Sequence, residues 1–167
     1  MAKKNNNIGS KISSFVLPGM FVLAWVMALS GSAAPGAVAG EATLVGYIKW
    51  ILFVCGWVFL FSSIMHSVFA KKMAASIGWK TNGFQYEIAF VSLGLALGCF
   101  YAVYYGTLQA WVAISLPIIS FLSLAGVNHL IEIVRKKNYA PNNTMILVWD
   151  FGVPISLVFL LLSIVKF

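Results

Sequence analysis

Five long apolar stretches constrain this chain more than any other feature of its sequence. Each is long enough, or nearly long enough, to cross the hydrocarbon core of a bilayer, which takes about 20 helical residues. They span residues 14–30, 45–70, 86–105, 108–134 and 144–165. The backbone must satisfy its own hydrogen bonds in lipid, and no stretch shows the alternation of a barrel strand, so each is predicted to be a helix. The sequence therefore predicts an all-α, polytopic membrane bundle of five transmembrane helices, forming one domain over residues 1–167.

The composition supports the same class of protein. Hydrophobic residues make up 61% of the chain and charged residues only 9%, which excludes an ordinary soluble domain. The net charge of +7 does not indicate nucleic-acid binding, because the basic residues fall in short clusters between the apolar stretches. The expected partner is therefore the lipid bilayer and not a nucleic acid.

The basic residues also predict an orientation. Five spans place nine of the 11 Lys and Arg residues on one side of the membrane and leave only Lys49 and Lys166 on the other. The positive-inside rule then puts the N-terminus in the cytoplasm and the C-terminus outside. The first helix, with lysines before it and small residues after it, resembles a signal peptide, and its cleavage would leave the other four helices in the same orientation. Residues 31–43 are rich in Gly, Ala and Pro, and they are expected to form an outside linker that packs little.

Five ionisable residues lie inside the predicted helices or at their ends. They are His66, Glu87, His129, Glu132 and Asp150. At a rise of about 1.5 Å per residue, all five fall in the cytoplasmic leaflet. Each of the two histidines and Glu87 shares a helical face with small or polar residues, so these faces are expected to point into the bundle and toward one another. A charge in hydrocarbon costs at least about 2.5–3.5 kcal/mol, so such groups are usually paired or functional.

Several arrangements would satisfy these groups. One is a transition-metal site with His66 and His129 as imidazole ligands and Glu87, Glu132 and Asp150 as carboxylate ligands. A second is a b-type haem held between the two histidines, and a third is a proton relay. The fourth is a structural hydrogen-bond cluster that fixes the register of the helices.

The individual residues also have plainer interpretations. His66 and Glu87 lie close enough to helix ends to snorkel or cap, and Glu132 is within one turn of Arg135 and Lys136, so it could form an ion pair at the rim. Asp150 is different, because no basic residue lies within its reach along its own helix. We therefore expect Asp150 to lie within direct or one-water hydrogen-bonding distance of His129 or His66.

No enzyme is indicated by a motif. The chain contains no phosphate-binding glycine loop, nucleophile elbow, HExxH or CxxC sequence. The favoured function is a non-catalytic membrane subunit or scaffold, which binds a membrane protein partner or a second copy of itself. The alternative is a protein that binds a metal or haem, or handles protons, at the polar cluster.

Five short segments carry a resemblance to a known family. They are "HSVFAKKMAASIGW", "FQYE", "GVNHLIEI", "NYAPNN" and "WDFGVPI". Together they resemble a family of small, uncharacterised bacterial inner-membrane proteins with the pattern His, IGW, FQ.E, a second His, N.APxN and an Asp before a Pro. The resemblance covers roughly residues 45–160 and implies the bacterial inner membrane as the location. It supports the helical fold and the selected residues, and it implies no reaction.

Overall fold

The computed structural model describes residues 8–164, and no β-strand occurs among them. In chain order the helices are α1 (Ile8–Ser14), α2 (Val16–Leu29), α3 (Thr43–Ser67), α4 (Ala70–Ser76), α5 (Phe84–Tyr105), α6 (Leu108–Lys136) and α7 (Pro141–Ile164). Five helical segments of this part of the chain are long and apolar enough to cross a membrane: Lys11–Leu29, Thr43–Ser67, Phe84–Tyr105, Leu108–Lys136 and Pro141–Ile164. The all-helical class and the five long apolar helices are as predicted from the sequence.

The outer surface of the bundle is apolar. Phe61, Phe90, Leu97, Leu124 and Phe159 are all exposed large side chains on the long helices. In water, contiguous apolar patches of this kind would drive aggregation, whereas in a bilayer they face hydrocarbon. An all-helical bundle with this exposed apolar surface is what a small multi-pass membrane protein requires.

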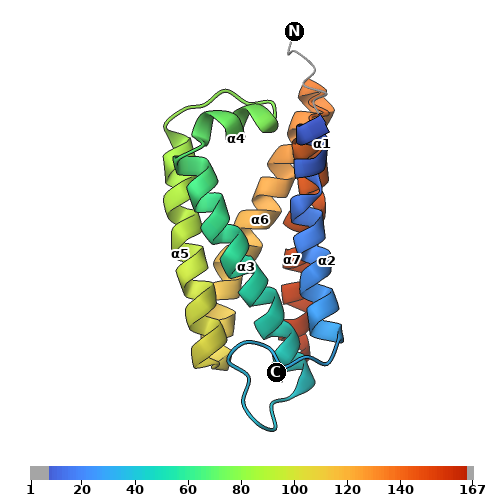
Figure 1. Ribbon diagram of the computed structural model, residues 1–167, viewed down its shortest axis with the longest axis vertical. Coiled ribbons are helices and arrows are strands. Elements are labelled where there is room, and N and C mark those ends of the chain that lie inside the picture. Colours follow the sequence, from blue (N-terminus) through green and yellow to red (C-terminus); the bar gives the residue numbers. More distant parts are fainter. Residues whose placement is uncertain (1–7, 165–167) are drawn as a thin grey trace.

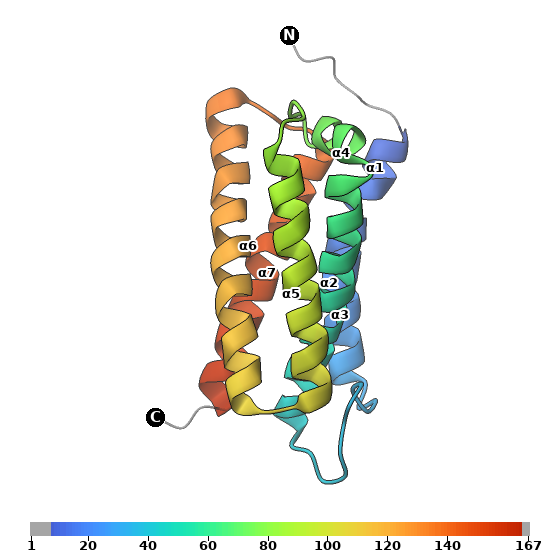
Figure 2. The ribbon, with the colours of Figure 1, turned by 90° about the vertical axis from the view of Figure 1, so that its left-hand side faces the viewer.

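Each of the five long helices packs against its two neighbours, so that together they form a closed ring. Helix α3 packs against α2, α5 and α7, while α6 packs against α5 and α7, and α2 completes the ring by packing against α7. The short helices α1 and α4 lie at one end of the bundle, and the tight α5–α6 turn lies at the other (Figures 1 and 2). We call these the α4 end and the α5–α6 end.

Two helix boundaries differ from the sequence prediction for local reasons. The first long helix is interrupted at Phe15, because Pro18 has no N–H with which to bond the carbonyl of Ser14. The second helix was expected to continue to residue 70, but α3 ends at Ser67, whose hydroxyl donates to the carbonyl of Ser63 at 2.7 Å. Such back-bonding bends helices, and the chain restarts as α4.

Helices α5 and α6 form an antiparallel hairpin. Gly106 ends α5 in the left-handed conformation with φ 56°, which glycine adopts without strain. Thr107 then caps α6, because its hydroxyl accepts a hydrogen bond from the backbone N–H of Ala110 at 3.2 Å.

The linker between α2 and α3 packs more closely than predicted, and the reason is Lys49. Lys49 lies about one and a half turns into α3 and is only 2% exposed. Its ammonium group forms an ion pair with Glu41 and donates to the carbonyl of Gly36 at 2.6 Å. The indole N–H of Trp50 donates to the carbonyl of Ser32 at 3.1 Å. Most residues of the linker are exposed, as expected, but Ser32, Gly36 and Glu41 contact α3 because the linker folds back to satisfy a buried cation.

Helix α2 packs as a member of the bundle, although its sequence resembles a signal peptide. Ala24 and Ala28 are buried, and the indole N–H of Trp25 donates to the hydroxyl of Ser156 on α7 at 3.0 Å. This contact joins the first and last long helices of the chain.

Candidate functional site

The site is centred on one pair of buried residues at the α4 end, His129 on α6 and Asp150 on α7. His129 is 6% exposed and Asp150 is 1% exposed. The Nε2 atom of His129 lies 4.0 Å from Oδ2 of Asp150. This distance is too long for a direct hydrogen bond and short enough for one bridging water or a small side-chain movement. Asp150 therefore lies close to a histidine of another helix, as predicted, but makes no direct hydrogen bond to it.

The other nitrogen of His129 fixes the protonation of the ring. Nδ1 of His129 lies 2.7 Å from Oδ1 of Asn143, and Nδ2 of Asn143 donates to the carbonyl of Asn138 at 2.9 Å. A carbonyl can only accept, so the amide of Asn143 must turn its oxygen toward the histidine. Nδ1 therefore donates the hydrogen, and in the neutral ring Nε2 presents its lone pair on the side of Asp150.

Asp150 is the least satisfied member of this arrangement. Its Oδ2 atom is buried and has no hydrogen-bond partner within residues 8–164. An ionised carboxylate in such a position loses its hydration without gaining a compensating donor, which is costly. A small movement that brings Oδ2 and Nε2 within hydrogen-bonding distance would let one proton between them satisfy both atoms.

The chain between α4 and α5 covers the histidine. The ring of Trp79 stacks on that of His129, with 5.5 Å between centroids and 16° between planes. Asn138, which follows α6, donates from Nδ2 to the carbonyl of Ile77 at 2.8 Å. Gly78 lies between these contacts with φ +81°, and a Cβ there would meet the side chain of Asn138 at 2.8 Å. Only glycine fits this turn, so Gly78 sets the position of the tryptophan.

A cleft of about 370 Å³ opens beside this cover. Its walls come from the α4–α5 connection and from α6, and they consist of Gly78, Trp79, Lys80, Asn82, Asn128, Glu132 and Lys136. Glu132 is buried and accepts from the largely exposed Lys136 at 2.5 Å, one helical turn away. The rim ion pair that the sequence allowed for Glu132 is therefore present.

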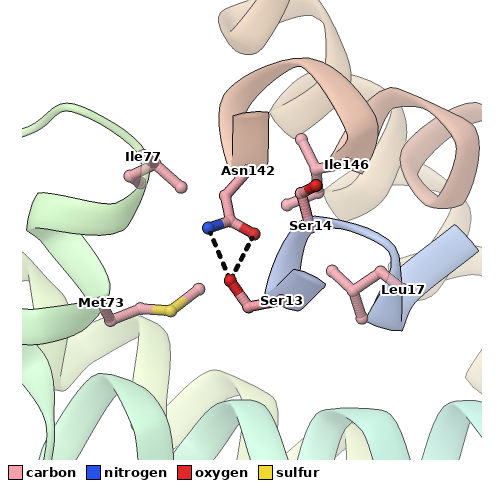
Figure 3. Close-up of a pocket in the computed structure, with 7 residues that line it drawn as sticks. All are labelled: Ser13, Ser14, Leu17, Met73, Ile77, Asn142 and Ile146. Carbon is pink, nitrogen blue, oxygen red and sulfur yellow. Dashed lines mark hydrogen bonds between the residues drawn. The ribbon is translucent and has the colours of Figure 1, made fainter. Parts of the chain in front are cut away.

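A smaller cavity lies nearby, between α1, α2, α4 and α7. Its volume is about 30 Å³, and it is lined by Ser13, Ser14, Leu17, Met73, Ile77, Asn142 and Ile146 (Figure 3). The amide of Asn142 donates to the hydroxyl of Ser13 at 3.2 Å across it. The cavity is large enough for about one water molecule and is a packing seam at the α4 end.

His66 belongs to a different polar contact. Its Nδ1 atom lies 2.6 Å from Oε1 of Gln85 on α5, and one turn earlier the hydroxyls of Ser62 and Ser92 lie 3.3 Å apart. These contacts join α3 to α5, whereas the His129 contacts join α6 to α7. The predicted inward faces of α3 and α6 are correct.

The predicted inward face of α5 was wrong. Glu87 is exposed, and the buried face of α5 consists of Gln85, Ala89, Ser92, Leu95, Ala96, Cys99, Ala102 and Val103. Glu87 lies two residues after Gln85, which turns it roughly 200° around the helix. The sequence selected the charged residue of this segment, although the neutral Gln85 is the one that contacts His66.

The five residues selected from the sequence are thus divided among separate contacts. His129 faces Asp150, Glu132 binds Lys136, His66 contacts Gln85, and Glu87 lies outside. In the part of the chain that the structure describes, no three or more His, Cys, Asp or Glu side chains are grouped so as to hold a metal ion. Metal or haem binding by these residues stays a prediction, which elemental analysis and absorption spectra of the purified protein would check.

Sequence comparison assigns the chain to a family. A family model described as a family of unknown function (DUF6790) matches residues 14–166. The chain belongs to this family. No curated protein and no solved structure matches it. Membership confirms the resemblance to an uncharacterised family, and it leaves the function to be argued from the His129–Asp150 pair.

Proposed function

We propose that this chain is a proton-binding protein of the bacterial inner membrane, whose His129–Asp150 pair takes up and releases one proton near the cytoplasmic face. The proposed orientation places the α4 end in the cytoplasm and the α5–α6 end outside. The charge bias supports it, because seven of the eight basic residues that the structure describes lie in segments at or next to the α4 end, and only Lys49 lies toward the other end.

The observation that supports proton binding most directly is the unpaired Oδ2 atom of Asp150 facing the lone pair of His129. One proton between them gives a pair with no net charge, either as a carboxylic acid beside a neutral ring or as a carboxylate beside an imidazolium. Loss of that proton leaves a net negative charge in a region of low dielectric constant. The pair therefore favours binding of one proton, and its proton affinity depends on the charges and the water around it.

The position of the pair also supports exchange with water. Trp79, which stacks on His129, is one wall of the cleft, and Glu132, one turn from His129 on α6, is another. A proton entering the cleft is thus separated from the pair by a single layer of side chains.

Infrared difference spectroscopy of the purified protein during a pH titration tests this function. We expect the carbonyl stretch of a buried carboxylic acid in the wild-type protein, and its loss in Asp150→Asn. Glu132→Gln is the matched control, because it removes a carboxylate from the neighbouring ion pair and should leave the band in place. Absence of the band at every pH, or its survival in Asp150→Asn, would refute proton binding at this pair.

A structural scaffold is the second candidate, and the hydrogen bonds from His129 through Asn143 and Asn138 to Ile77 favour it. They tie α6, α7 and the α4–α5 connection together, as a subunit that presents a fixed surface to a membrane partner or to a second copy would require. A scaffold has no need of the unpaired carboxylate. Asp150→Asn should then leave every property of the protein unchanged, including proton uptake after a pH jump.

A further inference from the structure

The cleft at the α4 end has a chemistry of its own, separate from the His129–Asp150 pair. Its volume of about 370 Å³ falls in the range of small-ligand sites, which run from about 300 to 1,000 Å³. Five of the seven residues that line it have polar side chains: Lys80, Asn82, Asn128, Glu132 and Lys136. A cleft that only accommodates hydrocarbon chains would not have such walls.

The charges of the walls favour an anion. Glu132 is the one acid that lines the cleft, and its carboxylate is already bound by Lys136 at 2.5 Å. Lys80 is exposed and adds a positive charge that this ion pair does not cancel. The cleft therefore carries one net positive charge.

The hydrogen-bonding groups are mainly donors. Asn82 uses its oxygen to accept from the backbone N–H of Phe84 at 3.0 Å, which leaves its NH₂ group for a ligand. Asn128 is exposed on α6 and offers a second amide, while Lys80 and Lys136 offer ammonium groups. Several donors around one net positive charge suit a ligand with several negatively charged oxygen atoms.

The location narrows the ligand further. The cleft lies between the α4–α5 connection and the last turns of α6, at the end of the bundle, and the aromatic ring of Trp79 lines it. Aromatic and basic residues at helix ends occupy the headgroup layer of a bilayer. Basic side chains there attract anionic phosphate groups.

We propose that this cleft binds a phosphate-bearing anion, held by Lys80, Lys136 and the amides of Asn82 and Asn128. The phosphate comes either from the headgroup of an anionic phospholipid or from a free phosphate compound in the cytoplasm. The proposal does not rest on the proton-binding function, because none of these four residues belongs to the His129–Asp150 pair.

Thermal unfolding of the detergent-solubilised full chain distinguishes the two sources. Three additions are compared: phosphatidylglycerol, phosphatidylcholine and inorganic phosphate. Stabilisation by phosphatidylglycerol beyond that by phosphatidylcholine assigns the cleft to an anionic lipid headgroup, whereas stabilisation by inorganic phosphate alone assigns it to a soluble ligand. The absence of any difference among the three would overturn the proposal.

Two lysines of the α4 end provide the matched variants. Lys80→Gln removes a cation that lines the cleft, and Lys71→Gln removes an exposed cation of α4 that does not. We expect Lys80→Gln to weaken binding of the stabilising addition about fivefold, since one lysine near an anionic surface contributes about that factor. Lys71→Gln should change it less than twofold. Equal losses in both variants would show a diffuse surface attraction, and the cleft would then have no role.

Asn128→Leu tests whether binding depends on the hydrogen-bonding groups of the cleft and not only on its charge. This change keeps the net charge and the helix and removes one donor, so binding should again weaken severalfold. Wild-type binding in Asn128→Leu would contradict the assignment of the amide as a ligand-binding group.

Discussion

Lys49 and Asp150 are both buried in the bundle, but the structure surrounds them differently. Lys49, at the α5–α6 end, has a carboxylate partner in Glu41 and a carbonyl partner in Gly36. Asp150, toward the α4 end, has an oxygen with no partner and a histidine nitrogen 4.0 Å away. A buried charge whose hydrogen-bonding groups are all paired is compatible with a purely structural role. A buried carboxylate with an unpaired oxygen destabilises the fold, so a functional reason for keeping it is expected. The comparison separates a structural ion pair from a functional candidate within one chain.

The largest effect is expected when the complete pair is broken. Glu41→Gln keeps the shape of the side chain and removes its charge, so Lys49 remains buried as an uncompensated cation. Removing one partner of a buried pair costs about 3–5 kcal/mol. We expect the free energy of unfolding to fall by about that amount, as measured by denaturant titration in detergent.

The double variant Glu41→Gln/Lys49→Met is the control for this experiment. Replacing both partners by neutral side chains removes the unpaired charge, so much of the lost stability should return. If Glu41→Gln alone is as stable as the wild type, the Glu41–Lys49 ion pair does not contribute to stability. The difference drawn between Lys49 and Asp150 would then be wrong.

A smaller loss is expected when the helices that carry His129 and Asp150 are forced apart. A Cβ at Gly126 of α6 would lie 2.8 Å from the ring of Phe151 and 3.1 Å from Cβ of Asp150. Gly126→Leu should therefore cost about 1–3 kcal/mol by overpacking and should lengthen the distance between the pair. Denaturant titration measures the first effect and the infrared band of Asp150 the second.

Gly94→Leu on α5 provides the comparison for Gly126. Nothing lies within 4 Å of a Cβ at Gly94, so the added side chain meets open space. If Gly126→Leu and Gly94→Leu destabilise the protein equally, the loss of stability comes from replacing a glycine in a helix. It does not then come from the close approach of α6 and α7.

The sequence predicted those features that depend on the length of apolar runs and on the cost of isolated charges. The five helices follow from hydrophobic length, and the expectation that Asp150 lies near His129 or His66 follows from the absence of a basic residue along α7; the structure places it near His129. Both inferences need only one helix at a time and the depth of each residue. Neither depends on which helices are neighbours.

The features that the sequence missed depend on neutral residues and on neighbours in space. Asn143 and Trp79 hold His129 in place, but an amide or an indole carries no charge cost that would single it out. Gln85 was passed over for the charged Glu87, two residues away on the opposite face. The burial of Lys49 depends on a linker that folds back, and the composition of that linker predicted little packing and no such contact.

Loss of the amide that orients His129 should have a moderate effect. Asn143→Ala removes the hydrogen bond to Nδ1 and the one to the carbonyl of Asn138. The bond to His129 joins α7 to α6, and a hydrogen bond between membrane helices contributes about 0.6–2 kcal/mol, so loss of this bond should lower stability by an amount in that range. Asn142→Ala is the matched control, because its neighbour contact with Ser13 lies at the exposed edge of the bundle and should contribute less.

The smallest change in stability is expected at Asp150 itself, and this prediction tests the comparison most directly. Asp150→Asn keeps the volume of the side chain and removes an acid whose Oδ2 atom has no partner in the described chain. The new NH₂ group can donate to Nε2 of His129 after a small movement, so the buried acceptor on the histidine gains a partner. The free energy of unfolding should then change by less than about 0.5 kcal/mol, or increase slightly, because no buried interaction is lost. A loss as large as that of Glu41→Gln would mean that Asp150 is held by a partner as complete as that of Lys49. If Asp150 serves to bind a proton, Asp150→Asn should keep the stability of the wild type and lose proton binding. The carboxylate then contributes its proton and not a packing interaction.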